Sequence, residues 1–168
     1  RYYFVSEADL LDILSNGSSP EKILVHIPKV YLSTKTLVLS KEEKSETGRP
    51  IAVEFIAGVG SETCAFEPPI ALEGKVEIYM QTILNAQKKS LFETVKRSLV
   101  RYHELKRPDW VLAKDEKTGM PLDPAQTTLL VLAVNYVNEV EQVLLNIENG
   151  EKSALEDYSK KQVEQLSQ

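Results

Sequence analysis

The chain has 168 residues, of which 42% are hydrophobic and 27% charged, so its length suits one ordinary domain and its composition suits a folded one. The longest uninterrupted apolar run, Leu129 to Val134, has six residues. A membrane span needs about 18, so we expect no membrane partner. The net charge of −5 argues against general nucleic-acid binding, which usually needs a basic surface.

The single cysteine, Cys64, excludes an internal disulfide and is typical of a reducing compartment such as the cytoplasm. The chain begins at Arg1 without an initiator Met, and no signal peptide or lipidation motif is visible. Its last residues, 164–168, continue a polar helical pattern. We therefore expect this chain to be a piece of a longer polypeptide.

Basic residues are concentrated in one stretch. Residues 73–107 contain eight Lys or Arg against four Glu, whereas the remainder of the chain is acidic. This asymmetry has two explanations. The stretch either faces an acidic surface, or its lysines solvate the outer side of a helix, where exposed ion pairs contribute little.

Residues 1–31 are predicted to form short helices. Ser6 is a good N-cap because acidic residues and an apolar set follow it, and Gly17 ends this first helix. Pro20 then stands at the first position of a second helix, where its missing N–H costs nothing. Pro28 should kink or end that helix.

Residues 36–66 are predicted to form a small antiparallel β insertion, and strands are expected nowhere beyond residue 75. Runs rich in β-branched and aromatic residues predict strands over 36–39, 51–56 and 63–66. A charged loop joins the first two strands, and Pro68-Pro69 is expected to stop the third. Three short strands need a helix to cover one face.

The rest of the chain is predicted to be helical. Apolar residues at three- and four-residue steps predict a long helix over 75–105, followed by a loop. A helix over 123–149 is apolar all round in its first half, so we expect it, Leu132 included, to be buried. A mostly polar terminal helix over 152–168 has a thin apolar stripe that suits a coiled-coil-like contact.

These elements together predict a mainly α fold class. We expect residues 1–168 to be a single segment of long antiparallel helices, a helical-bundle rod, with a small antiparallel β-hairpin or three-stranded insertion.

The sequence carries no active-site motif. Gly58 to Ser61 lacks the Lys-Ser/Thr pair of a phosphate loop and the third Gly of a dinucleotide loop. His26 and His103 lie in separate predicted helices, without Cys, Asp or a second His at metal-ligand spacing. Cys64 is expected to be a small buried hydrophobe. Trp110 either anchors a partner or caps the helical core. No catalytic, cofactor-binding or metal-ligating residue is assigned.

Six short motifs occur in the order in which a known family carries them. They are Arg1-Tyr2-Tyr3-Phe4-Val5-Ser6, Gly60-Ser61-Glu62 with Phe66, Gly74-Lys75-Val76-Glu77, Trp110-Val111, Pro124-Ala125-Gln126 and the run from Asp157 to Leu166. Together they resemble the linker region of the dynein heavy chain, N-terminal to the AAA+ ring. The last run is similar to the axonemal, outer-arm-like version.

The resemblance implies a mechanical role. In that family the linker is a bent helical rod that lies across a ring of six AAA+ modules and swings as the nucleotide changes. It implies that ATP and Mg²⁺ are bound by the parent motor's AAA+ modules and not by this chain. The implied partners are the AAA+ ring of the same heavy chain and other dynein subunits, with microtubules contacted through distant parts. The implied location is the axoneme of a cilium or flagellum.

Two other classes of function are considered from the residues. A free-standing helical scaffold or adaptor that binds partner helices agrees with the thin apolar stripe of residues 152–168. A nucleic-acid binder that uses the basic stretch 73–107 is disfavoured by the acidic remainder.

Overall fold

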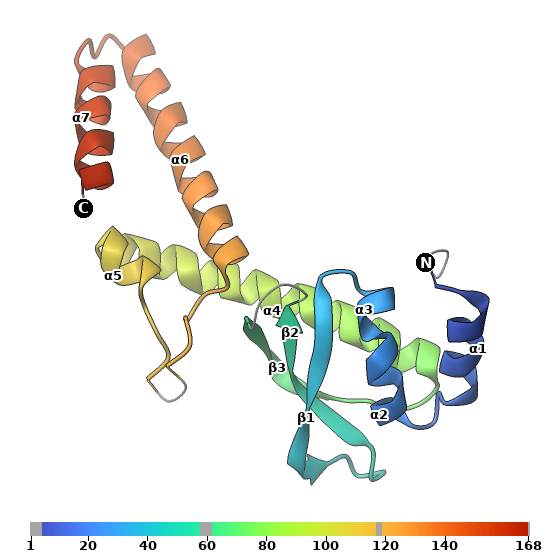
Figure 1. The fold of residues 1–168 in the computed structure, drawn as a ribbon. Helices are drawn as coiled ribbons and strands as arrows, with labels where there is room; N and C mark the ends of the chain where they lie inside the picture. The colour runs from blue at the N-terminus through green and yellow to red at the C-terminus, as the bar shows by residue number, and fades with distance from the viewer. Residues whose placement is uncertain (1–4, 58–61, 117–118, 168) are drawn as a thin grey trace. The chain divides into compact units, whose positions relative to one another are not determined.

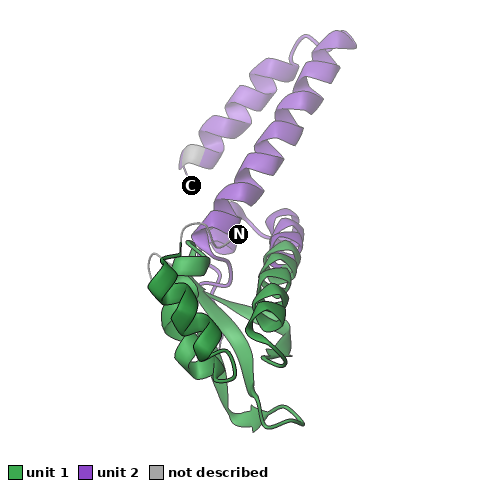
Figure 2. Ribbon diagram, turned by 90° about the vertical axis from the view of Figure 1, so that its right-hand side faces the viewer, with its two compact units in different colours: residues 1–93 green, residues 94–168 purple. Residues whose placement is uncertain are grey.

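The computed structural model describes residues 5–57, 62–116 and 119–167 (Figure 1). The chain divides into two compact units, residues 1–93 and residues 94–168 (Figure 2). Each unit is described by itself below.

The first unit opens with short helices, as predicted. They are α1 (Glu7–Ser15), α2 (Pro20–Ile23), the 3-10 turn η1 (Leu24–His26) and α3 (Ile27–Val30). Ser6 is the N-cap of α1, and its hydroxyl accepts a hydrogen bond from the backbone N–H of Asp9 at 3.2 Å. Pro28 stands near the start of α3. The proline therefore begins a new helical turn rather than kinking one long helix.

A three-stranded antiparallel sheet follows, in the order β1-β2-β3. Its strands are β1 (Thr34–Lys44), β2 (Pro50–Ala57) and β3 (Thr63–Ala71). They are longer than the predicted runs, and β3 passes through Pro68-Pro69, where we expected it to stop. β3 is an edge strand, and its register with β2 shifts between the pairs Ala52–Ile70 and Glu54–Ala65, so Pro68 and Pro69 lie in an irregular stretch where their missing N–H groups cost no ladder hydrogen bond. Beyond residue 75, the described residues hold one isolated β-bridge, between Lys114 and Pro121.

The core of the first unit lies between the sheet, the short helices and the first turns of α4 (Val76–Glu104). Phe55 and Phe66 from the sheet have ring centroids 5.2 Å apart. Tyr79 and Met80 of α4 are each 2% exposed in the same cluster. Two polar links accompany this packing. Tyr31 donates to the Met80 carbonyl at 2.6 Å, and Gln87 donates to Thr34 at 2.9 Å.

The second unit contains the end of α4 and three further helices. These are α5 (Arg107–Val111), α6 (Ala125–Glu148) and α7 (Ala154–Ser167). The last two form a helical hairpin, visible in both ribbon views (Figures 1 and 2). Gly150, with φ of +93°, makes the turn between them in a conformation that favours glycine.

The predicted fold class, a helical-bundle rod of long antiparallel helices, is wrong. The first unit is a small mixed α/β domain, in which the sheet is a layer of the core and not an insertion into a bundle. The sequence pattern misled because the predicted runs were shorter than the strands that form, and inward residues of these strands, such as Leu37 and Phe55, belong to the buried core. Among the described helices, α6 and α7 form the antiparallel hairpin.

The structure also differs from the expectation that the helix over 123–149 is buried. In α6, the buried residues are Thr127, Val131 and Asn135, and Leu132 is half-buried. Leu129 is 65% exposed. One side of α6 is covered within the unit, and the apolar residues on its other sides face outward. Apolar residues on all sides of the first half of α6 therefore do not mean that this helix is buried within the chain.

Candidate functional site

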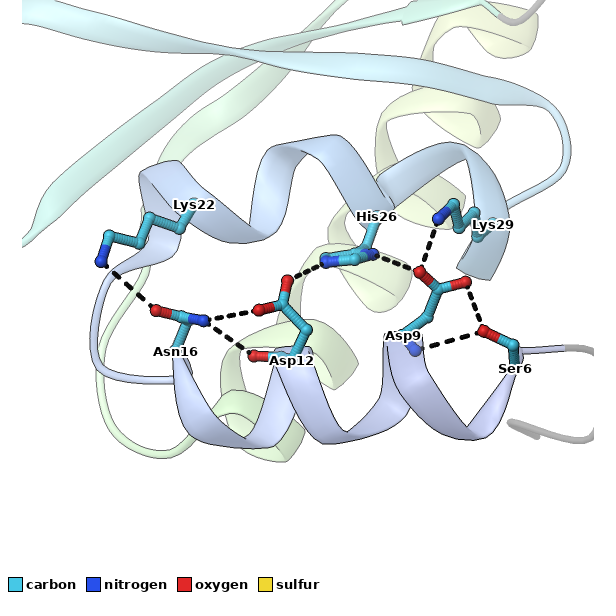
Figure 3. Close-up of polar contacts among 7 residues, drawn as sticks. All are labelled: Ser6, Asp9, Asp12, Asn16, Lys22, His26 and Lys29. Carbon is cyan, nitrogen blue, oxygen red and sulfur yellow. Dashed lines mark hydrogen bonds and ion pairs between the residues drawn. The ribbon is translucent and has the colours of Figure 1, made fainter.

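The most elaborate polar cluster of the first unit surrounds His26 (Figure 3). The imidazole belongs to η1 and is 4% exposed. Its Nε2 lies 2.6 Å from Oδ2 of Asp12, and its Nδ1 lies 3.6 Å from Oδ1 of Asp9. Asp9 and Asp12 are three residues apart in α1, so both carboxylates stand on the same face of that helix. One histidine thus faces two carboxylates.

The cluster extends in both directions from the ring. Lys29 of α3 approaches Oδ1 of Asp9 at 2.6 Å, and the Ser6 hydroxyl donates to Oδ2 of Asp9 at 2.8 Å. These two donors, with the Lys29 hydrogen bond the larger cause, hold the pKa of the Asp9 carboxyl below its usual value. At the other end, the Asn16 amide donates to Asp12 at 2.8 Å.

This arrangement is not a catalytic triad. A triad needs a nucleophile whose proton the imidazole can take, and the imidazole in turn held by a carboxylate. Here the Ser6 hydroxyl donates to Asp9, and both ring nitrogens of His26 face carboxylates. Within residues 5–57, 62–116 and 119–167, no group of three His, Cys, Asp or Glu side chains is placed to hold a metal ion. The geometry is that of a clamp between helices.

A second polar cluster lies in the second unit, around Trp110. The Trp110 indole N–H donates to the Ser98 hydroxyl at 3.1 Å, and that hydroxyl donates to Oδ2 of Asp123 at 2.6 Å. Arg101 forms an ion pair with the other oxygen of Asp123. The Tyr102 ring stands edge-on to Trp110, with centroids 5.1 Å apart. This cluster ties the end of α4 to α5 and to Asp123, two residues before the start of α6.

The structure places the remaining candidate residues as follows. Trp110 is 2% exposed, which favours its role in capping the helical core over a role in anchoring a partner. His103 is exposed near the end of α4, edge-on to Tyr102. Cys64 is buried in β3 and takes part in no disulfide. The predicted turn at 58–61 lies outside the described residues.

Sequence reasoning missed the partners of His26. Asp9 and Asp12 precede it by 17 and 14 positions, so no local ligand spacing connects them. The available signal was the three-residue step between the two Asp residues on the helix that Ser6 caps. It indicates a paired acidic face, but it does not say which side chain that face meets.

The outer surface of α6 is unusually apolar. Leu129, Val137 and Leu144 are each half exposed or more. Among the described helices, α6 is the one long and apolar enough to cross a membrane, with a mean hydropathy of 1.2 over 18 residues, of which 11% are buried. Length and composition alone are weak signals of a span, because an ordinary core helix meets the same criteria. An exposed apolar side of this kind is typical of an interaction surface.

Comparison with known proteins identifies the family. The family model for the dynein heavy chain, N-terminal region 2, matches residues 1–98. The dynein alpha chain of the flagellar outer arm from Chlamydomonas reinhardtii is 34% identical over 99% of this chain and 4% of its own length. Dynein axonemal heavy chain 17 from Homo sapiens is 32% identical over 99% of this chain and 4% of its own length. The dynein beta chain of the flagellar outer arm from Chlamydomonas reinhardtii is 31% identical, with 99% and 3% covered.

The chain therefore belongs to the dynein heavy chain family, and the resemblance seen in its ordered motifs is confirmed. It spans about 4% of the length of these curated relatives.

Proposed function

We propose that this chain is a mechanical linker, or lever, of a dynein motor in a cilium or flagellum. It would transmit the ATP-driven conformational change of an AAA+ ring into minus-end-directed movement along a microtubule. The support is the family membership, together with relatives whose names place them in axonemes and flagellar outer arms. In physical terms, the nucleotide state would change which docked position of the lever is favoured.

The structural observation that carries this proposal is α4. It is an uninterrupted helix of 29 residues, which corresponds to a length of about 44 Å. Tyr79 and Met80 hold its first turns in a buried apolar cluster, while Ser98 and Arg101 hold its last turns on Asp123. Because side chains fix both of its ends, such a helix is suited to pass a displacement along its axis.

The chemistry of the motor is assigned to the parent chain. We propose that ATP and Mg²⁺ are bound in AAA+ modules of the parent heavy chain, and that this chain takes no catalytic part. Its partners would be that ring and the other subunits of a dynein complex, with microtubules contacted through distant parts of the parent. Because the curated relatives are far longer than this chain, we propose that further heavy-chain segments, and not a membrane or nucleic acid, cover the exposed side of α6.

The test is whether bending α4 uncouples movement from ATP hydrolysis. Proline in place of Leu91, in the full-length heavy chain, should slow microtubule gliding while ATP hydrolysis continues. Normal gliding by a folded proline variant would contradict the lever.

The second candidate is a free-standing helical scaffold that binds partner helices. It is favoured by the exposed apolar side of α6, with Leu129 at 65% and Leu144 at 55% exposure. The reading frame that encodes the chain separates the two candidates. A lever lies within a chain of thousands of residues, with a Walker A motif some hundreds of residues downstream, whereas a scaffold does not.

A further inference from the structure

The surroundings of His26 are unusual for a buried histidine. The ring is 4% exposed, and both of its nitrogens face carboxylates of α1. The Nδ1 atom is buried and has no hydrogen-bond partner, because Asp9 lies 3.6 Å away. A buried polar atom without a partner normally costs free energy, so its occurrence between two helices requires an explanation.

The protonation chemistry of imidazole supplies one. A neutral ring has one N–H donor and one bare lone pair. The distance of 2.6 Å between Nε2 and Asp12 places the single proton of the neutral ring on Nε2. Nδ1 then presents a lone pair to the Asp9 carboxylate, which is an unfavourable pairing. A second proton on Nδ1 turns this contact into an ion pair, and the ring then faces both carboxylates with donors.

The other charged groups around the ring leave Asp9 negative in the range where imidazole titrates. Lys29 of α3 and the Ser6 hydroxyl favour the ionised form of Asp9, whose pKa they lower. Lys22 of α2 donates to Asn16 at 3.3 Å, on the far side of Asp12. Among the described residues, β1 and α4 add no carboxylate within 4 Å of the ring. Lys29 approaches the same Oδ1 of Asp9 that faces Nδ1, so its positive charge offsets part of the negative field there. Asp12 supplies a second negative charge at the ring, so the two carboxylates together outweigh the one ammonium group.

Few side chains of α1 are buried. Ile13 is its one buried residue, and Leu11 and Leu14 are each 58% exposed. Ile13, the half-buried Leu10 and the His26 cluster therefore hold α1 along its length, and the Tyr79–Gly17 hydrogen bond lies beyond its C-terminal end.

We propose that His26 is a proton-dependent clasp, in which a second proton on the imidazole tightens the docking of α1 against the α2–α3 segment and its loss loosens that docking. Binding of the proton and docking of the helix are linked, so each favours the other. Imidazole titrates near neutral pH whereas carboxyl groups titrate near pH 4. Docking should therefore weaken as the pH rises and the second proton leaves the ring.

The test is nuclear magnetic resonance of the 168-residue chain between pH 5.5 and 8.5. The α1 amides should shift along the titration curve of the His26 ring, and their hydrogen-exchange protection, corrected for intrinsic rates, should fall about threefold or more as the proton is lost. His103 is the internal control, because its titration should leave the α1 amides unmoved. Amides of α1 that do not follow the His26 titration would overturn the proposal.

Three variants sharpen the result. His26→Gln should remove the pH dependence of protection in α1, whereas His103→Gln should retain it. Asp9→Asn removes the carboxylate that faces Nδ1 and should reduce the same dependence. If His26→Gln fails to fold, the titration of the unmodified chain and the Asp9→Asn comparison still decide the question. An unchanged pH dependence in a folded His26→Gln variant would contradict the clasp.

Discussion

Tyr79 of α4 donates its phenolic hydroxyl to the backbone carbonyl of Gly17 at 3.1 Å, across 62 positions of sequence. The ring is 2% exposed, so the hydrogen bond is buried with it. Gly17 lies close to the start of α4, since a Cβ added there would meet the Val76 Cβ at 3.0 Å. The end of α1 is thus fixed on α4 by a close backbone approach that a larger residue would disturb.

Tyr79→Phe should destabilise the chain by about 1–3 kcal/mol, because the Gly17 carbonyl loses its buried donor while the apolar packing of the ring is kept. Urea unfolding followed by circular dichroism measures this. Tyr136→Phe is the control, since the Tyr136 ring is 57% exposed on α6. Equal stability of the two variants would mean that the hydroxyl of Tyr79 contributes nothing.

The Ser98 hydroxyl of α4 is hydrogen-bonded to two other segments, at Trp110 and at Asp123. Ser98→Ala removes a hydroxyl that is 0% exposed, accepts from the Trp110 indole and donates to Asp123. Two buried polar groups lose a partner, so we expect a loss of about 2–4 kcal/mol in the free energy of unfolding. Ser159→Ala, at an exposed position of α7, should change stability by less than about 0.5 kcal/mol. A similarly small effect at Ser98 would show that the cluster does not stabilise the second unit.

Local patterns predicted local structure in this chain. Ser6 as an N-cap, the three strands and the long helix that became α4 depend on residues close in sequence, and each is found near its predicted place. The contacts of His26 and Tyr79 join positions 14 to 62 residues apart, and no periodicity encodes them. The prediction that the helix over 123–149 is buried failed for a different reason. An apolar helix predicts a covering surface, but not whether that surface lies within the same 168 residues.

The burial of α6 can be tested with a pair of neighbouring positions. Val131 is 0% exposed and Leu129 is 65% exposed on the same helix. Val131→Ala should cost about 1–3 kcal/mol because it leaves a cavity. Leu129→Ala should cost about 0.5 kcal/mol or less. Thermal unfolding of both variants of the 168-residue chain checks this, and a larger loss at Leu129 would mean that the outer face of α6 is covered.

The acid side of the stability profile should depend on Asp9. Lys29 first, and Ser6 second, lower the pKa of this carboxyl in the folded chain. A carboxyl whose pKa is lowered on folding contributes stability at pH values above its unfolded pKa, which is about 4. That contribution is lost as the pH falls through the lower, folded pKa. In the Asp9→Asn variant the melting temperature, measured by calorimetry, should therefore fall less steeply as the pH is lowered below 5.

Asp157→Asn, at an exposed position of α7, is the control and should leave that acid profile unchanged. If Asp9→Asn and the unmodified chain lose stability in parallel below pH 5, the Asp9 cluster does not link protonation to folding.

The last prediction concerns the lever itself and is made for the full-length heavy chain. Leu91→Pro removes one backbone hydrogen bond in the middle of α4 and brings the proline ring against the Gln87 carbonyl. The change costs about 3 kcal/mol or more and kinks the helix. Because the Leu91 side chain is 40% exposed, its loss alone should matter little, so Leu91→Ala is the matched control. Paired assays should show severely reduced microtubule gliding with ATP hydrolysis retained for proline, and near-normal values of both for alanine.

Lys89 is exposed on the same helix, and Lys89→Ala should have little effect unless the basic side of α4 docks on an acidic surface. In that case its effect should fade as salt rises, since charges are screened over about 8 Å at physiological ionic strength. Coupled loss of gliding and hydrolysis in the proline variant would indicate that α4 supports the ring's chemistry instead of transmitting its stroke.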